Sequence, residues 1–559
     1  MFQAVLDPVV GNLALSALVA CVPLVTFFIM LMSVKAKAHV SAAVALAAAV
    51  VVACLGFKMP LDLALVSATQ GAAYGAFPIV FIILSAVWMY DMTVKSGRAN
   101  DLRAFFDEVG AGDIRIQATM ITFCFGGLLE ALAGFGSPVA ITATMLVTLR
   151  VDPKKAALAA LIANTAPVAY CSAGLPITTA ASMVSGGDAA LTTSIAQHVG
   201  AIVGCQAPLC ALLVPFLILI ILDGKKGIAE CWLPALVMGL SFGLMQWWCS
   251  NHFIFELTDI LATLTSLGCI VLFMRFWKPK GVAEVRERFG IDPFDGQSKS
   301  QLNGDRIFMA LLPYFLLSFV IAFCKMGIPQ VLSATDIKIP WPVISGGAIL
   351  SYSGADPGTT FNFNILSTPG TMILFSGILS AAIYSLHTEN GRYAMSMGSA
   401  LEQCGASIVN MRFSALTIVL VLALAYVMNF SGQTISIGYF LAGSGSAFSF
   451  ISPVIGWVGT AVTGSDTSAN ALFAGLQYMA ATSNPALANI SPDLFLAANT
   501  MGGVMGKMIS PQSLAIAALV THVHESEIMK SILPWSFGLL IGLCVLVFLQ
   551  SGPLYFLVP

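Results

Sequence analysis

The stretch GLLEALAGFGSPVAIT, residues 127–142, lies inside an apolar block that extends from residue 116 to residue 149. A basic residue flanks the block at each end, Arg115 and Arg150, and Lys and Arg gather on the cytoplasmic side of membrane-embedded segments. Both ends of the block are therefore expected on the same side of a bilayer. Because GFGSP at 134–138 is a poor helix interior and a good turn, we predict a re-entrant hairpin with its tip there. Two ordinary spans around a short buried turn are the alternative.

Apolar blocks fill most of the chain. Of its 559 residues, 58% are hydrophobic and only 9% are charged, and the mean hydropathy is +0.90. Blocks of about 20 residues are long enough for a helix to cross a hydrocarbon core of about 30 Å. We predict an all-α polytopic membrane protein embedded in the lipid bilayer. The net charge of −2 argues against a nucleic-acid partner, and the 12 Cys include no C-x-x-C pair, so no metal site and no other cofactor is predicted.

A second apolar block, residues 435–480, has the features of a matching hairpin. No basic residue flanks this block, so we expect it to enter the bilayer from the outside. Its middle carries the polar turn sequence Thr463–Asp466, which is the predicted tip.

Motifs recur in the same order in the two halves of the chain. Ala163–Thr165 recurs as Ala498–Thr500, and Gly136–Ser137 at the first tip recurs as Gly464–Ser465 at the second. An odd number of crossings precedes the second repeat, so it starts on the opposite side of the bilayer. The repeats are then inverted, an arrangement that many secondary transporters use.

The fold class predicted from this pattern is two inverted repeats with about 12 transmembrane helices and two re-entrant hairpins. The predicted parts are repeat 1 (residues 1–227), two linking spans (228–276), a cytoplasmic loop (277–306) and repeat 2 (307–559). Repeat 1 comprises three spans, the hairpin 116–149, a broken helix 156–185 and a span 193–222; repeat 2 contains the hairpin 435–480, a broken helix 492–521 and the last span 532–552. Both termini are expected on the extracytoplasmic side, because no basic residue precedes the first span.

Four helix interruptions are expected to meet near the middle of the membrane, two from each repeat. Interrupted helices are tolerated in lipid only where protein or a water-filled cavity satisfies the freed backbone groups. Helix N-termini and neutral donors at such a place suit the carboxylate of a small organic anion, and glycines there, such as those in the interruption Gly502–Pro511, would let the backbone approach it. The predicted substrate-binding residues are Gly136, Ser137, Asn164, Thr165, Gly464, Ser465, Thr467, Ser468, Asn470, Asn499, Thr500 and Ser510. That these polar residues only cap the broken helices stays an open alternative.

Three charged residues lie within the apolar segments, where an unpaired charge is costly. Glu130 precedes the first tip by one helical turn, Asp466 lies at the second tip, and Lys507 follows Gly506 in the last interruption. We predict that Glu130 or Asp466 takes up and releases a coupling proton. Lys507 either holds the substrate carboxylate or forms a fixed ion pair with one of the two acids. The absence of a Walker A motif and of an H-E-x-x-H motif disfavours ATP-driven transport and membrane enzymes.

Four segments closely resemble the lactate permease family of bacterial L-lactate and glycolate permeases, within the ion-transporter superfamily. They are GLLEALAGFGSPVAIT (127–142), LIANTAPVAY (161–170), TGSDTSANALFAGLQ (463–477) and AANTMGGVMGKMISPQSLAIA (497–517), and the similarity extends along nearly the whole chain. The resemblance implies proton-coupled uptake of a 2-hydroxy monocarboxylate, L-lactate, D-lactate or glycolate, across the bacterial inner membrane. It also implies an elevator-type transporter architecture with paired hairpins.

The resemblance carries a set of signature residues and two departures. The signature residues are Glu130, Gly134, Gly136, Asn164, Thr165, Gly464, Ser465, Asp466, Asn470, Asn499, Thr500, Lys507 and Ser510. Where the family is expected to carry Gly-Arg-Gln, this chain reads Gly204–Gln206 with Cys205 in the middle, so that a positive charge is absent. The segment SNHFIFELTDI (250–260) also departs from the family's pattern. Either change indicates a different acid, or a different way of neutralising it.

Three functions stay open on the sequence. The leading hypothesis is a proton symporter, and the second is a sodium-coupled carboxylate transporter, since oxygen atoms at the helix interruptions would also suit Na⁺. The third is a channel or a sensor, which the short cytoplasmic loops disfavour. The sequence does not decide the preferred hydroxy acid or whether the chain forms a homodimer.

Overall fold

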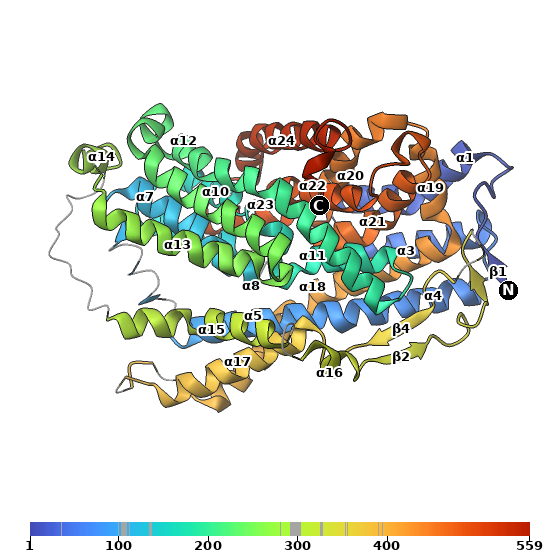
Figure 1. Ribbon diagram of the computed structural model, residues 1–559, viewed down its shortest axis with the longest axis horizontal. Coiled ribbons are helices and arrows are strands. Elements are labelled where there is room, and N and C mark those ends of the chain that lie inside the picture. The colour runs from blue at the N-terminus through green and yellow to red at the C-terminus, as the bar shows by residue number, and fades with distance from the viewer. Residues whose placement is uncertain are drawn as a thin grey trace.

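Helices make up most of this protein, and they form an elongated bundle in which most of them follow the long axis (Figure 1). The computed structural model describes residues 1–559 except 35, 99, 102–104, 106–108, 111, 133–136, 280, 291–302, 325–327, 353, 355, 390 and 394. Across the described residues, nine helices are long and apolar enough to cross a membrane, or up to eleven if each of two bent helix pairs counts as one span. This confirms a mainly helical, multi-pass membrane protein; the predicted total of about 12 spans stays a prediction.

One group of helices surrounds the central helix α18 (Met397–Ser431). The elements of this group that pack directly on α18 are α3 (Ala38–Leu55), α4 (Leu61–Tyr74), the π-helix η1 (Gly75–Val80), α5 (Phe81–Lys95) and α17 (Pro369–Leu386). Farther from α18, α2 (Val22–Met32) packs on α3, α15 (Gly304–Ala322) packs on α17, and α1 (Leu13–Ala20) packs on helix α19, described below; the short helix α16 (Pro329–Ser333) follows α15 in the chain. Helices α4 and α18 nearly touch, because a Cβ on Gly71 would lie 2.5 Å from the carbonyl oxygen of Leu422. Glycine is therefore needed at this crossing.

Two short sheets lie at the end of the bundle that holds the N-terminus (Figure 1). Strand β1 (Phe2–Gln3) pairs in parallel with β3 (Ile349–Leu350), and β2 (Ile337–Pro340) pairs antiparallel with β4 (Thr360–Phe363). The polar stretch between α16 and α17 is thus partly ordered.

The first predicted hairpin contains two helical arms. The first arm consists of α7 (Ile114–Thr119), the π-helix η2 (Met120–Phe125) and α8 (Gly126–Leu132), and the second arm is α9 (Ser137–Thr148). The arms lie side by side, since a Cβ on Gly126 would approach the Thr142 side chain to 3.3 Å. The predicted tip at 134–136 lies outside the described residues.

The second hairpin is shorter than the predicted block 435–480. Helix α19 (Gln433–Ala442) is separate, because the chain bends by 117° between Ala442 and the short 3-10 turn η6 (Gly445–Ala447), which leads into the next helix. The hairpin itself consists of α20 (Phe448–Thr463) and α21 (Asp466–Thr482). Gly464 joins them with a φ of +76°, a left-handed conformation that favours glycine.

Two broken helices follow the two hairpins. The first comprises α10 (Pro153–Ala163), the 3-10 turn η3 (Val168–Tyr170) and α11 (Cys171–Val184), with a bend of 54°. Three consecutive residues, Ser172 to Gly174, have φ values of 48°, 59° and 71°. Backbone strain of this kind persists only where the surrounding structure holds it. The second comprises α22 (Asp493–Lys507) and α23 (Pro511–Thr521), preceded by the 3-10 turn η7 (Pro485–Leu487).

The two linking segments and the last span complete the bundle. Helix α12 (Ala189–His252) contains a break at Gly224, and its two halves lie antiparallel, because Gly239 abuts Leu212 and Gly243 abuts Pro208. The remaining helices are the 3-10 turn η4 (Phe255–Leu257), α13 (Thr258–Phe276), α14 (Val282–Arg288), α24 (Glu525–Gln550) and the 3-10 turn η8 (Tyr555–Leu557).

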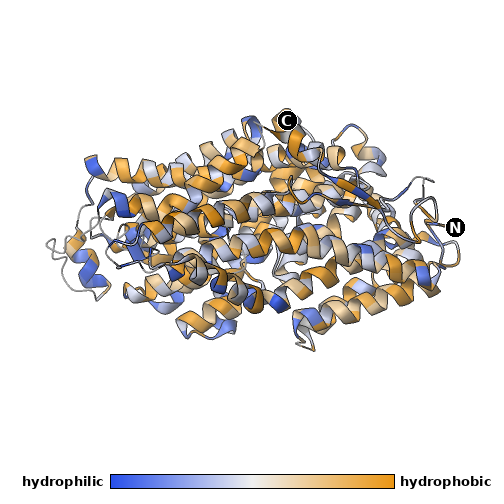
Figure 2. Ribbon diagram, turned by 90° about the horizontal axis from the view of Figure 1, so that it is seen from below, coloured by the Kyte–Doolittle hydropathy of each residue, from blue (hydrophilic) through white to orange (hydrophobic). Residues whose placement is uncertain are grey.

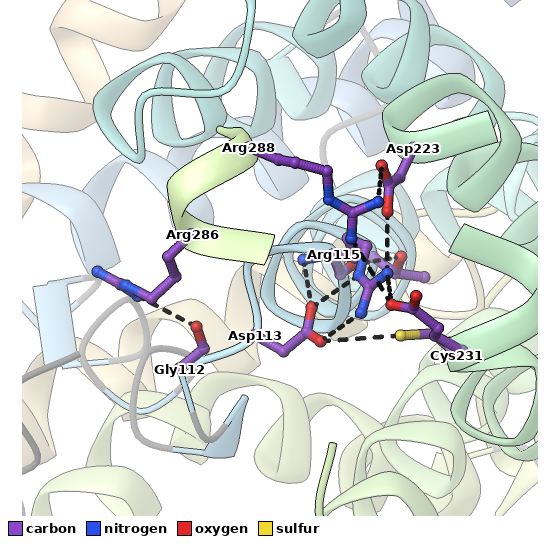
Figure 3. Close-up of polar contacts among 9 residues, drawn as sticks. Gly112, Asp113, Arg115, Asp223, Cys231, Arg286 and Arg288 are labelled. Atoms are coloured by element: carbon purple, nitrogen blue, oxygen red, sulfur yellow. Dashed lines mark hydrogen bonds and ion pairs between the residues drawn. The ribbon is translucent and has the colours of Figure 1, made fainter. Parts of the chain in front are cut away.

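Hydrophilic residues are most frequent toward the ends of the bundle, while hydrophobic residues make up most of the helices (Figure 2). At the end opposite the N-terminus, Arg115 is fully buried and forms an ion-pair network (Figure 3). Its guanidinium lies 2.9 Å from Asp113, 2.9 Å from Asp223 and 2.6 Å from Glu230, and Arg288 of α14 lies 3.2 Å from Asp223. The network ties the start of the first hairpin to the turn of α12 and to α14.

Candidate functional site

The interrupted helices of the two halves lie against one another in the middle of the bundle. Helix α11 packs against α8 of the first hairpin and against both α21 and α22 of the second half. Helix α23 packs against α9 and α10. The predicted site residues therefore come from segments that contact each other, although they lie far apart in the sequence.

Lys507 forms a buried ion pair with Glu130. The ammonium at the end of α22 contacts Oε1 of Glu130 on α8, and the two side chains are 7% and 0% exposed. The side chain of Asn164, at the end of α10, also lies beside the Glu130 carboxylate. Among the described residues, neither Oε2 of Glu130 nor Oδ1 of Asn164 has a hydrogen-bond partner. The pair thus places a buried cation against a buried carboxylate, and two nearby oxygen atoms accept no hydrogen bond from the described residues.

Asp466 opens α21 directly after the tip of the second hairpin. Its Oδ1 accepts hydrogen bonds from the Thr460 hydroxyl at 3.3 Å and from the Asn470 amide at 3.4 Å. A Cβ on Gly503 would lie only 2.0 Å from this oxygen, so the carboxylate rests directly on α22. Oδ2 of Asp466 has no hydrogen-bond partner in the described part of the chain.

The amide side chains of the second half form a continuous hydrogen-bond network. Oδ1 of Asn470 accepts from the Asn499 amide at 2.9 Å and from the Thr500 hydroxyl at 3.0 Å. The Gln477 amide donates to Oδ1 of Asn499 at 2.8 Å, and Ser452 donates to Gln477 at 2.5 Å. The network fixes the orientation of each amide and links the hairpin to α22.

The remaining predicted residues mainly cap helices. Ser465 accepts from the backbone N–H of Ser468 at 3.3 Å, and Ser510 accepts from that of Ser513 at 3.3 Å, so both are N-caps. The Thr165 hydroxyl donates to the Ile162 carbonyl at 2.6 Å. Thr467 and Ser468 are buried in the first turn of α21, and Gly464 forms its left-handed turn. Gly134 and Gly136 lie outside the described residues, and Ser137 starts α9 but its side chain is not described.

Glycines of α20 and α22 bring these two helices into direct backbone contact. A Cβ on Gly502 would lie 2.0 Å from the Pro453 carbonyl oxygen, one on Gly506 would lie 2.2 Å from that of Trp457, and one on Gly456 would lie 2.0 Å from that of Asn499. The sequence analysis assigned the small residues here to close approach of a ligand. The structure instead uses these three for helix packing.

Replacing Gly502 by Ala is expected to destabilise the folded protein strongly, because the added methyl group meets backbone atoms that cannot move aside. The melting temperature in detergent and the yield of monodisperse protein after solubilisation measure the effect. Gly538→Ala in α24 is the matched control, since a Cβ there has nothing within 4 Å. Equal stability of the two variants would contradict the packing described for α20 and α22.

The sequence analysis missed one acidic residue of this centre, Asp259. It lies in the first turn of α13, is 1% exposed and faces Glu130. The thiol of Cys171 lies within electrostatic range of Asp259, Glu130, Asp466 and Lys507 together. The centre therefore contains three carboxyl groups and one ammonium group. The sequence signal that could have identified Asp259 is a charged residue inside an apolar span.

The fold and the site together define a multi-pass membrane transport protein with a buried charged centre. The chain belongs to the L-lactate permease family, whose sequence profile matches residues 16–552. Members of this family are permeases, so the protein is a transporter and not an enzyme.

Named relatives support this membership over the full length. The chain is 36% identical to an L-lactate permease of Bacillus subtilis (strain 168), with 99% of each chain covered. It is 37% identical to the glycolate permease GlcA of Escherichia coli (strain K12), with 96% of each covered, and 36% identical to an L-lactate permease of the same strain, with both fully covered. The YdaH transporter of Alcanivorax borkumensis aligns with a TM-score of 0.32 at 15% identity, over 79% of this chain and 86% of that one, which is too weak to define the fold.

Proposed function

We propose that this protein takes up a 2-hydroxy monocarboxylate, L-lactate, D-lactate or glycolate, by proton symport across the bacterial inner membrane. The observation that carries the proposal is the buried Lys507–Glu130 pair where the interrupted helices of the two halves meet. The names of two relatives, an L-lactate permease at 36% identity and the glycolate permease GlcA at 37% identity, support the substrate class.

Exchange of counter-ions at Lys507 couples the substrate to a proton. The substrate carboxylate replaces Glu130 as the partner of the Lys507 ammonium, and Glu130 takes up a proton as it loses that partner. The ammonium has one negative partner before and after this exchange, so the net charge of the pair and its ligand does not change. One proton therefore enters with each organic anion at this pair. A desolvated ammonium without a counter-ion would cost several kcal/mol, which prevents the proton and the anion from moving separately.

The unused acceptor of Asn164 accounts for recognition of the 2-hydroxyl group. Oδ1 of Asn164 is buried beside Glu130 and has no hydrogen-bond partner in the described ranges. A substrate whose carboxylate binds Lys507 places its 2-hydroxyl group close enough to donate to this oxygen. A substrate without the hydroxyl leaves the acceptor unpaired, which costs about 1–3 kcal/mol.

Asn164→Ala is therefore expected to raise the KM for L-lactate about tenfold while changing propionate transport little, because propionate lacks the hydroxyl. Competition of both acids against labelled L-lactate measures the change in preference. Thr144→Val serves as a control on α9, where the hydroxyl donates to the Ala140 carbonyl. An unchanged ratio of lactate to propionate affinity in Asn164→Ala would contradict this role.

Purified protein in proteoliposomes tests the proposed function. With an acidic exterior and no Na⁺, labelled L-lactate should accumulate, and a protonophore should abolish the accumulation. The alternative is a sodium-coupled carboxylate transporter, which the unpartnered side-chain oxygens at the site also suit. Accumulation that strictly requires a Na⁺ gradient would establish this alternative, and uncoupled flux in both directions would establish a channel.

We further propose that the two halves are inverted repeats of an elevator-type transporter. Both halves present a hairpin followed by a broken helix, and the motif Ala163–Thr165 recurs as Ala498–Thr500, although Asn164 ends α10 and Asn499 lies inside α22. The helices around α18 would form the static part. Cysteine cross-links between the two groups of helices that block transport without blocking substrate binding would support this motion.

A further inference from the structure

Asp259 is a buried carboxyl group that the counter-ion exchange between Lys507 and Glu130 does not use. It is 1% exposed, and within the described chain neither Oδ1 nor Oδ2 has a hydrogen-bond partner or an ion pair. The Gln246 side chain adjoins it, and the Gln246 amide nitrogen donates one of its two N–H groups to the Ala166 carbonyl at 3.1 Å.

Asp259 lies on the face of α13 that packs against α8. A Cβ on Gly127 would lie 3.0 Å from the Thr263 hydroxyl oxygen, which places these two residues opposite each other. Asp259 precedes Thr263 by about one helical turn, and Glu130 follows Gly127 by about one turn. The carboxyl groups of Asp259 and Glu130 therefore face the same point of the site, in agreement with their mutual electrostatic interaction.

No basic side chain faces Asp259 among the described residues. The titratable groups that face it are Glu130 of α8, Tyr170 of η3, Cys171 of α11 and Cys249 of α12. None of these groups is a base that could balance a carboxylate, and Tyr170 already donates its hydroxyl to the Gly200 carbonyl at 2.7 Å. An ionised carboxylate without a partner at this depth costs several kcal/mol, so Asp259 is a neutral acid in this conformation.

We propose that Asp259 carries a second proton in each transport cycle, in addition to the proton that Glu130 takes up. The inference rests on the proposed function, because it assigns a further role in the same symport. When the site opens to the cytoplasm, water enters and the O–H bond of the acid breaks. The proton passes to water, and the electron pair stays on the carboxylate oxygen. The carrier then returns outward with Asp259 ionised in the first turn of α13, where the free backbone N–H groups of the helix stabilise a carboxylate, and a proton from the exterior restores the neutral acid.

Two protons per organic anion make uptake electrogenic. Each cycle then moves one net positive charge inward, whereas the exchange at Lys507 and Glu130 alone moves none. Moving this charge down a membrane potential of about 100 mV, negative inside, releases about 2.3 kcal/mol. This free energy corresponds to about 50-fold accumulation of the organic anion inside. Asp259→Asn keeps a neutral polar side chain of the same size in place of the acid and removes the second proton.

The experiment is uptake of labelled L-lactate into proteoliposomes under a valinomycin-imposed K⁺ diffusion potential with equal pH on both sides. The native protein should accumulate L-lactate under this potential. Asp259→Asn should lose the response to potential while still accumulating L-lactate when the exterior is acidic. The control is Asp91→Asn on α5, which removes a span carboxylate that is hydrogen-bonded to Ser407 at 2.5 Å, and it should stay electrogenic.

Measurements on the native protein alone already test whether a second proton is carried. Accumulation driven by an acidic exterior but insensitive to potential would overturn the role of Asp259 and leave the proposed function standing. A response to potential that persists in Asp259→Asn would also overturn it. If Asp259→Asn does not fold, the inference is tested on the native protein by measuring the net charge that enters with each labelled L-lactate. A ratio of zero charges per L-lactate rejects the inference. Failure of accumulation under every proton gradient would instead reject the proposed function.

Discussion

Replacing Lys507 by Met should abolish accumulation of L-lactate, because no cation then remains to bind the substrate carboxylate. The same change leaves Glu130 buried without its partner, which should lower the free energy of unfolding by about 3–5 kcal/mol. Uptake in proteoliposomes and the melting temperature in detergent measure the two effects separately.

The double variant Lys507→Met/Glu130→Gln separates transport from stability. Replacing both members of a buried pair by neutral side chains removes the unpaired charge, so the melting temperature should recover toward that of the native protein. Accumulation should stay absent. A double variant that is both stable and active would show that the pair is a fixed structural ion pair, the alternative that the sequence left open.

The second large effect is expected for Glu130→Gln, which should lose proton-driven accumulation but keep exchange of internal for external L-lactate. A glutamine resembles the protonated acid, so the loaded carrier can still cross in both directions, whereas the empty carrier cannot restore the Lys507–Glu130 pair that its return requires. Net uptake should fall by about a hundredfold, since a charge-assisted hydrogen bond of about 1.5–3 kcal/mol is lost.

Parallel assays of net uptake and of counterflow on the same proteoliposomes distinguish these two outcomes for Glu130→Gln. Glu402→Gln is the control, because this exposed residue pairs with Lys95 at the end of the bundle, away from the site. Native-like net accumulation by Glu130→Gln would contradict the role of Glu130 in coupling.

The sequence located the charged centre because charges are rare and costly in apolar spans. Glu130, Asp466 and Lys507 stand out for this reason alone, and the structure brings them close to one another around Cys171. The partner of Lys507 could not be read from the sequence. The pair with Glu130 joins residues separated by 377 positions, so it depends on how α8 and α22 approach.

Asp259 escaped notice because it lies in the first turn of a span, next to the polar segment 250–256. Acidic residues at that place commonly face water and favour the helix N-terminus. Only the tertiary structure buries it, under η3, η4 and α12. The start of the second hairpin was misplaced for a different reason, because the prediction of one block over 435–480 passed over the turn sequence GSGS at 443–446, where the chain bends.

The helix-packing role of the glycines was also hidden from the sequence. Gly502 and Gly506 lie in a motif with Lys507 and Ser510, so their proximity to polar residues favoured contact with a ligand. Their contacts instead lie with Pro453 and Trp457 of α20. Which neighbour fills the space above a glycine depends on helix crossings that no local pattern encodes.

A structure of the protein with L-lactate bound tests the exchange of counter-ions at Lys507 most directly. The expected map shows the lactate carboxylate about 2.9 Å from the Lys507 ammonium and the Glu130 carboxyl released from it. A map in which Lys507 remains paired with Glu130 while lactate binds elsewhere would contradict the counter-ion exchange on which the coupling depends.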